Sequence, residues 1–167
     1  MLSVLSDLRI ERDYECAPET LWRAWIDEKL LVTWFGPERA PASNFVTDVR
    51  PGGTWRACLD AGENGGELRV SGKFEHVEEN VCLVFTFRWD HNPDEGGKGV
   101  NTRVGVDFIP LTKKRTRLVL TQSNLANPES AARHTEGWDS CLDRLATAVA
   151  ASAQGRTFIA SMANKPT

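Results

Sequence analysis

The sequence has no excess of positive charge. Its 20 Lys and Arg residues are outnumbered by 23 Asp and Glu residues, which gives a formal net charge of -3. Both signs are interspersed along the chain, so the sequence offers no basic patch of the kind that binds a phosphate backbone. We therefore expect no nucleic-acid partner.

Long apolar runs are also missing. No stretch of the sequence approaches the roughly 18 consecutive apolar residues that cross a bilayer. The first nine residues lack the basic region, apolar run and small-residue cleavage site of a secretory signal. We therefore expect a cytoplasmic protein with no membrane partner.

Residues that bind metals, form disulfides or act as nucleophiles are few. Cys16, Cys58, Cys82 and Cys141 contain no CxxC pair, and the three histidines have neither HxxxH nor HxH spacing. Isolated thiols in a reducing compartment behave as small buried apolar side chains. No serine or cysteine stands in a recognisable nucleophile motif. We expect no disulfide, no metal site and no cofactor, and the sequence identifies no catalytic residue.

The composition that remains is typical of one folded domain. Apolar residues make up 41% and charged residues 26% of the 167 positions, which suffices for a single core at this length. Amphipathic order fades after Ala153. We therefore expect a domain over residues 1–153 and a partly disordered tail over residues 154–167.

The first part of the chain predicts one strand followed by two short helices. Residues 2–16 alternate loosely between apolar and charged side chains, as in a half-buried strand. Pro18 suits the first turn of a helix, because no N–H is needed there, and Glu19 favours the positive end of the helix dipole. A second helix over residues 28–35 is ended by Gly36-Pro37.

The middle of the chain predicts an antiparallel meander. Turn-forming residues divide it into six runs with a period of two. These runs are residues 43–49, 54–59, 67–77, 81–89, 99–109 and 115–122. In the fourth run an apolar set shares one face, which we expect to be buried; it consists of Val81, Leu83, Phe85, Phe87 and Trp89.

A long helix is predicted near the end of the chain. Asn127 is a good helix cap and Pro128 suits the first helical position. Spacings of three and four then give one apolar stripe, which we expect to lie across the sheet. The stripe consists of His134, Trp138, Cys141, Leu142, Leu145, Ala148 and Val149. We also expect the missing side chain of Gly137 to let this helix approach the sheet closely.

Several local strings occur in the order found in one known family. They include Ala17-Pro18-Glu19 with Leu21-Trp22-Arg23-Ala24-Trp25, Trp34-Phe35-Gly36-Pro37, Asp48-Val49-Arg50-Pro51-Gly52-Gly53, Gly72-Lys73-Phe74, and His134 with Gly137-Trp138. The ordered set resembles the Hsp90-ATPase-activator homology family of the START-like (SRPBCC) superfamily.

This resemblance implies an α+β helix-grip fold. In that fold a curved antiparallel sheet of about seven strands wraps around a long C-terminal helix, and two short helices follow the first strand. Related proteins enclose an elongated cavity between sheet and helix that takes small, mostly apolar ligands. The family is named after a co-chaperone that stimulates the Hsp90 ATPase, so a chaperone partner and a role in the stress response are also implied.

The predicted ligand site combines the concave face of the sheet with the inner face of the last helix. Aromatic walls with a few polar groups are typical of small-molecule pockets. The predicted lining residues are Trp55, Phe85, Phe87, Trp89, Val104, Val106, Phe108, His134, Trp138 and Leu142. For Trp22, Trp25 and Trp34 the sequence favours a place in the core.

Two groups of polar residues allow alternative interpretations. His134 either presents a titratable donor to a ligand or is a structural histidine. Arg88, Arg103 and Arg117 either converge on an anion or lie on a solvated outer face, and their alternation with the apolar residues favours the outer face.

The sequence leaves three functions open. The first is a domain that binds a small hydrophobic or amphipathic ligand. The second is a small enzyme of the cyclase, aromatase or hydrolase type that uses the same pocket. The third is a co-chaperone that acts through its surface. A homodimer is also expected, because the tryptophan-rich residues 22–35 offer more apolar surface than two short helices bury.

Overall fold

The computed structural model describes residues 5–163, with side chains described for residues 5–151. Its elements, in chain order, are β1 (Ser6–Tyr14), α1 (Pro18–Ile26), α2 (Glu28–Trp34), β2 (Ala42–Thr47), β3 (Thr54–Asp60), α3 (Gly62–Gly65), β4 (Glu67–Glu78), β5 (Cys82–His91), the short 3-10 helix η1 (Pro93–Glu95), β6 (Thr102–Thr112), β7 (Arg115–Leu125) and α4 (Pro128–Ala163).

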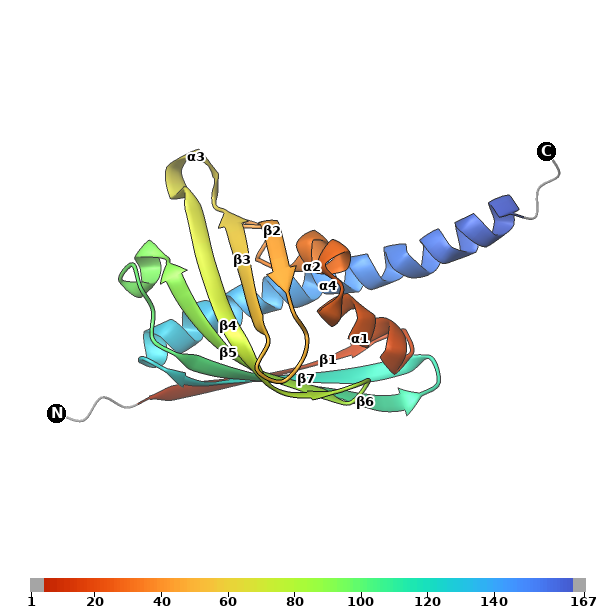
Figure 1. Ribbon diagram of the computed structural model, residues 1–167, viewed down its shortest axis with the longest axis horizontal. Helices are drawn as coiled ribbons and strands as arrows, with labels where there is room; N and C mark the ends of the chain where they lie inside the picture. Colours follow the sequence, from red (N-terminus) through yellow and green to blue (C-terminus); the bar gives the residue numbers. More distant parts are fainter. Residues whose placement is uncertain (1–4, 164–167) are drawn as a thin grey trace.

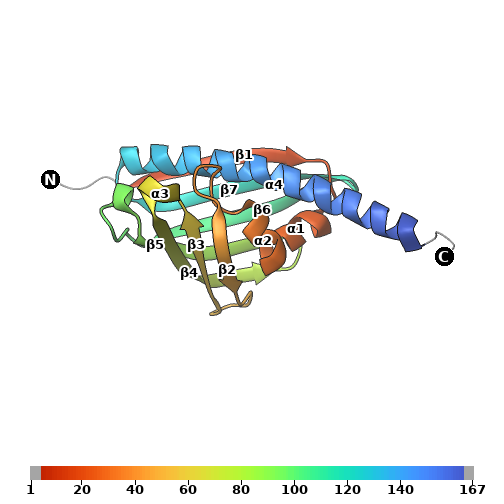
Figure 2. The same ribbon diagram turned by 90° about the horizontal axis from the view of Figure 1, so that it is seen from above.

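The seven strands form one antiparallel sheet in the order β1-β7-β6-β5-β4-β3-β2. Figure 1 shows that the sheet is curved and that α4 lies along its concave side, and Figure 2 shows α1 and α2 beside the middle of α4, away from α3. The helix-grip fold predicted from the sequence is confirmed. No helix in the described part of the chain is both long enough and apolar enough to cross a membrane.

Polar contacts fix α4 against the edge strand β1. The Tyr14 hydroxyl donates to the Leu142 carbonyl oxygen at 2.9 Å. Arg12 donates to Asp139 at 2.9 Å and to Asp143 at 2.6 Å. Because the two aspartates lie one turn apart on α4, one guanidinium sets both the position and the rotation of the helix.

A second arginine fixes α2 and the loop that follows it to α4. The last carbonyl groups of a helix lack partners within the helix. Arg144 of α4 donates to the carbonyl oxygens of Thr33, Trp34, Phe35 and Gly36, at 2.6 Å in the case of Gly36. Gly36 has a φ of +87°, and a Cβ there would lie 2.4 Å from the Ala40 oxygen, so glycine is required at this turn.

The tryptophans of α1 and α2 belong to the core, as expected. Trp22, Trp25 and Trp34 are 5%, 4% and 0% exposed. The Trp34 indole donates to the Ala24 carbonyl oxygen at 2.9 Å, which joins the two helices. The apolar surface from which we inferred a homodimer is therefore buried within the chain. A homodimer stays a prediction without that support.

Two local expectations differ from the structure. Val81 lies in the β4–β5 turn and is 46% exposed, because the hairpin turns one residue later than the alternation suggests. A Cβ on Gly137 would meet nothing within 4 Å, so this glycine leaves open space and does not serve close packing. The expected domain boundary at residue 153 lies within α4, which runs to Ala163. That boundary and the partly disordered tail expected over residues 154–167 stay predictions, and residues 164–167 lie outside the described residues.

Candidate functional site

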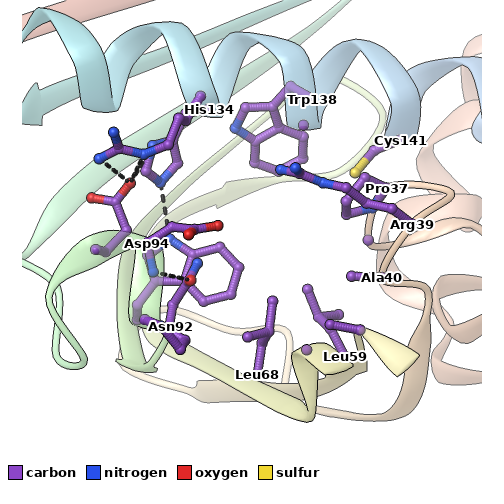
Figure 3. Close-up of a pocket in the computed structure, with 18 of the residues that line it drawn as sticks. Pro37, Arg39, Ala40, Leu59, Leu68, Asn92, Asp94, His134, Trp138 and Cys141 are labelled. Atoms are coloured by element: carbon purple, nitrogen blue, oxygen red, sulfur yellow. Dashed lines mark hydrogen bonds and ion pairs between the residues drawn. The ribbon is translucent and has the colours of Figure 1, made fainter. Parts of the chain in front are cut away.

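A cavity of about 370 Å³ lies between the first half of α4 and the neighbouring end of the sheet (Figure 3). This volume falls within the usual range for small-molecule sites, about 300–1,000 Å³. Its walls come from four places in the chain: α4, the loop over residues 36–40, the corner between β3 and β4, and β5 with η1. Residues distant in sequence therefore surround one space.

The inner walls of the cavity are apolar. Leu59 and Leu68 come from β3 and β4, and Figure 3 shows them facing Trp138 and Cys141 of α4 across the space. Ala40 adds to the wall beside Leu59. Such a surface favours the apolar body of a ligand, because burying apolar area is favourable by about 25 cal/mol per Å².

Charged side chains stand at the rim. Arg39 and Asp94 are exposed and extend into the mouth from opposite sides. Neither forms an ion pair with another side chain in the described part of the chain. The rim therefore presents one cation and one anion that remain available to a polar group of a ligand.

A third charged residue, Glu95 of η1, is instead held by α4. Its carboxylate accepts from the Ser130 hydroxyl at 2.8 Å and from Arg133 Nε at 3.0 Å. The side chain is 10% exposed. A hydrogen-bonded, largely buried carboxylate is costly to release, so Glu95 acts as a latch that holds η1 against the start of α4.

Both ring nitrogens of His134 are used within the protein. Nε2 lies 3.0 Å from Trp89 Nε1, and because an indole can only donate, Nε2 is the acceptor. Nδ1 therefore carries the proton and donates to the Ser130 carbonyl oxygen at 2.7 Å. Burial lowers the pKa of His134, opposed by this hydrogen bond and by the charge of Glu95. The ring is neutral at pH 7, and the structural interpretation of His134 fits this geometry better than a donor to a ligand.

Trp138 also has an internal partner. Its Nε1 donates to Gln122 Oε1 at 2.8 Å, Gln122 Nε2 donates to Thr102 Oγ1 at 2.9 Å, and Thr102 donates to the Phe87 carbonyl oxygen at 2.7 Å. Gln122 is fully buried. A Trp138→Phe substitution would therefore leave a buried amide oxygen unpaired and would disturb the fold as well as the cavity wall.

Four of the ten residues predicted to bind a ligand line this cavity: Phe87, Trp89, His134 and Trp138. The other six are Trp55, Phe85, Val104, Val106, Phe108 and Leu142. All six are buried in the core, and Trp55 also donates through Nε1 to the Thr86 carbonyl oxygen at 3.1 Å. The aromatic rings of α1 pack against Phe108 and occupy the space that a ligand would need there.

Sequence reasoning missed the cavity residues that lie in or next to turns. Leu59 and Leu68 flank the predicted turn over residues 60–66, and Arg39 and Asp94 lie in loops. Loops near one end of a sheet commonly carry binding residues, but their proximity follows from the tertiary fold. The clustering of glycine and asparagine in these turns was the available signal.

The three arginines considered as an anion clamp do not converge. Arg88 pairs with Asp90, Arg103 with Glu75 and Arg117 with Asp13. They lie on different parts of the outer sheet face, as their alternation indicates. The thiol of Cys141 lines the cavity, but burial raises its pKa to about 12. Thiolate, the nucleophilic form of cysteine, is therefore scarce at neutral pH.

A curved sheet closed by a long C-terminal helix over a cavity defines a helix-grip domain of the START-like type. Residues 15–150 match the family described as activator of Hsp90 ATPase homolog 1-like protein, and the chain belongs to this family. A search of curated proteins gave no match.

Solved structures from bacteria share the fold. The AHSA1 protein from Silicibacter pomeroyi is 32% identical with a TM-score of 0.74, and the match covers 88% of this chain and 99% of that protein. A protein from Chromobacterium violaceum is 22% identical with a TM-score of 0.70, covering 85% and 96% of the two chains. A protein of unknown function from Staphylococcus aureus is 19% identical with a TM-score of 0.71, covering 90% and 98%.

Proposed function

We propose that this domain binds a small amphipathic ligand in the cavity between the sheet and α4. The observation that carries the proposal is a space of about 370 Å³ with apolar inner walls and unpaired charges at its rim. The apolar body of the ligand lies between Leu59, Leu68 and Trp138, and its polar end lies at the mouth near Arg39.

Binding is favoured over catalysis by the state of the polar groups near the cavity. A general base needs a free lone pair within hydrogen-bond reach of the substrate. His134 uses both nitrogens internally, Glu95 is bonded to Ser130 and Arg133, and Cys141 stays protonated. The charged groups that remain at the mouth, Arg39 and Asp94, are suited to orienting a ligand.

The test uses a fluorescent amphiphile, 8-anilinonaphthalene-1-sulfonate, which combines an aromatic body with one anionic group. Leu68→Trp adds bulk to the cavity wall, so we expect its affinity for the probe to fall by about tenfold or more. Leu111→Trp is the matched control, because Leu111 is 40% exposed on β6 and does not line the cavity. Equal binding by wild type and Leu68→Trp would show that the probe does not use the cavity.

The family also supports a second candidate, a co-chaperone that acts through its surface. In that case the purified domain would stimulate the ATPase of Hsp90, and Leu68→Trp would stimulate it as well as the wild type. If Leu68→Trp lost both ATPase stimulation and probe binding, the two functions would instead share one site. No stimulation at a molar excess of the domain would remove this candidate.

A further inference from the structure

The β4–β5 hairpin carries three different metal-binding groups on the face of the sheet opposite the cavity. They are the imidazole of His76, the carboxylate of Glu78 and the thiol of Cys82. One donor atom from each lies within 4.8 Å of the other two. Cys82 points away from α4, because the next residue, Leu83, is 1% exposed and faces the core.

The hairpin brings the three groups together through its register. Glu78 and Cys82 are directly opposite each other across the turn over residues 79–81. Asn80 has a φ of 63°, a conformation that asparagine tolerates better than most residues. The Val81 N–H closes the turn by donating to the Glu78 carbonyl oxygen at 2.9 Å.

A β-bulge turns His76 to the same face. Phe74 is buried, so strict alternation would also direct His76 toward the core. The register of β4 against β5 shifts between Phe74 and His76, which adds one residue to β4 at this point. His76 and Glu78 consequently share the outer face, and bulges commonly redirect side chains in this way.

Two of the three distances between ligand atoms suit a tetrahedral ion, and the third lies within 4.8 Å. Bonds of about 2.0–2.3 Å from zinc to its ligands place two ligand atoms roughly 3.3–3.8 Å apart. His76 Nε2 lies 3.4 Å from Glu78 Oε2, and Cys82 Sγ lies 3.8 Å from the same oxygen. A mixed set of nitrogen, sulfur and oxygen donors suits zinc and similar transition metals better than calcium or magnesium.

The surrounding charge is negative. Asp107 of β6 lies directly opposite Cys82 on the side away from Glu78. A divalent cation would relieve the repulsion between the carboxylates of Glu78 and Asp107.

We propose that His76, Glu78 and Cys82 form a three-residue site for Zn²⁺ or a similar divalent transition metal. Binding joins β4 to β5 at one end of the sheet, and Cys82 binds as the thiolate. This site is independent of the cavity, because its residues point away from α4.

Cobalt(II) tests the site directly, since its thiolate charge-transfer and tetrahedral ligand-field bands report which atoms bind it. We expect the full chain, freed of any tag, to bind one equivalent of Co²⁺ with both bands, and Zn²⁺ to displace it. Cys82→Ser should abolish the charge-transfer band, and both Cys82→Ser and His76→Ala should weaken Zn²⁺ binding by about tenfold or more. Both positions lie on the outer face of the sheet, and near-ultraviolet circular dichroism checks the fold of each variant.

Cys58→Ser is the matched control, because Cys58 is also a partly buried free thiol but lies on β3, outside the cluster. It should bind Co²⁺ as the wild type does. Absence of saturable binding at one equivalent, or unchanged binding by Cys82→Ser, would overturn the proposal. Loss of binding in Cys58→Ser with retention in Cys82→Ser would place the metal elsewhere and would also overturn it.

Discussion

The space between the sheet and α4 is filled at one end and hollow at the other. At the filled end, Trp25 contacts Trp34, Phe108 and Trp138, with ring centroids 4.7, 6.4 and 6.2 Å apart. At the hollow end, Leu59 and Leu68 face α4 across the cavity. The walls are apolar at both ends, so apolar character alone does not make a pocket. The difference is that α1 and α2 supply rings to one end and do not reach the other.

The largest expected effect comes from removing a ring at the filled end. Trp25→Ala should lower the free energy of unfolding by about 3–5 kcal/mol, because a large side chain leaves a cavity in close-packed surroundings. Leu68→Ala should cost about 1 kcal/mol, since Leu68 is half-buried and already borders open space. Urea unfolding followed by circular dichroism measures both. Similar costs for the two variants would contradict the distinction between the ends.

The next effect is a pH dependence of stability, which comes from His134, beside the Glu95 latch at the hollow end. The pKa of His134 is lower in the folded protein than in the unfolded chain, so the unfolded chain binds more protons below about pH 6.5. This contribution to stability is full above that pH and declines as pH falls toward the folded-state pKa. Protonation also places a hydrogen on Nε2, which breaks the bond from Trp89. Arg133 and Glu95, the charged groups facing the ring, have opposite signs.

The measurement is the urea midpoint of the wild type and of His134→Gln between pH 5 and 8, a window that follows from the ordinary histidine pKa of about 6.5. We expect the wild-type midpoint to fall more steeply than the midpoint of the variant as the solution becomes acidic. His76→Gln serves as a control, because His76 is an exposed histidine outside the latch. Parallel pH profiles for the wild type and His134→Gln would remove His134 from this explanation.

The smallest effect concerns Gly137, which lines the cavity within α4. Because a Cβ there meets nothing within 4 Å, Gly137→Ala should raise the free energy of unfolding by about 0.5–1 kcal/mol, the usual penalty of glycine in a helix. Thermal unfolding measures the change. A destabilised variant would mean that the helix lies closer to the sheet than the structure places it.

The fold followed from the sequence because its signals are local. The alternation from Leu83 to Trp89 and the stripe from His134 to Leu145 each report one face of one element, and both faces are buried as predicted. The cavity was less predictable. Phe108 and Phe87 carry the same signal of an inward-facing aromatic residue, yet the rings of α1 cover Phe108 while Phe87 remains at the cavity wall.

The proposed metal site shows a second reason why sequence patterns fell short. Motif searches compare spacings along the chain, and the three histidines have no regular spacing. The grouping of His76, Glu78 and Cys82 depends on the register of a hairpin and on one inserted residue in β4. Neither feature can be read from the alternation of apolar and polar residues. A rule based on alternation would therefore place His76 on the inner face of the sheet, together with Phe74.

The unequal attachment of the two walls to α4 bears on how fast a ligand exchanges. On one side, Arg144 binds four consecutive carbonyl groups that run from the end of α2 into the following loop, so that wall is anchored through backbone at several points. On the other side, η1 is tied to α4 through the single carboxylate of Glu95. We expect the cavity to open by release of η1 from α4. The lifetime of the Glu95 contacts, and not the depth of the apolar walls, would then set the association rate of a ligand.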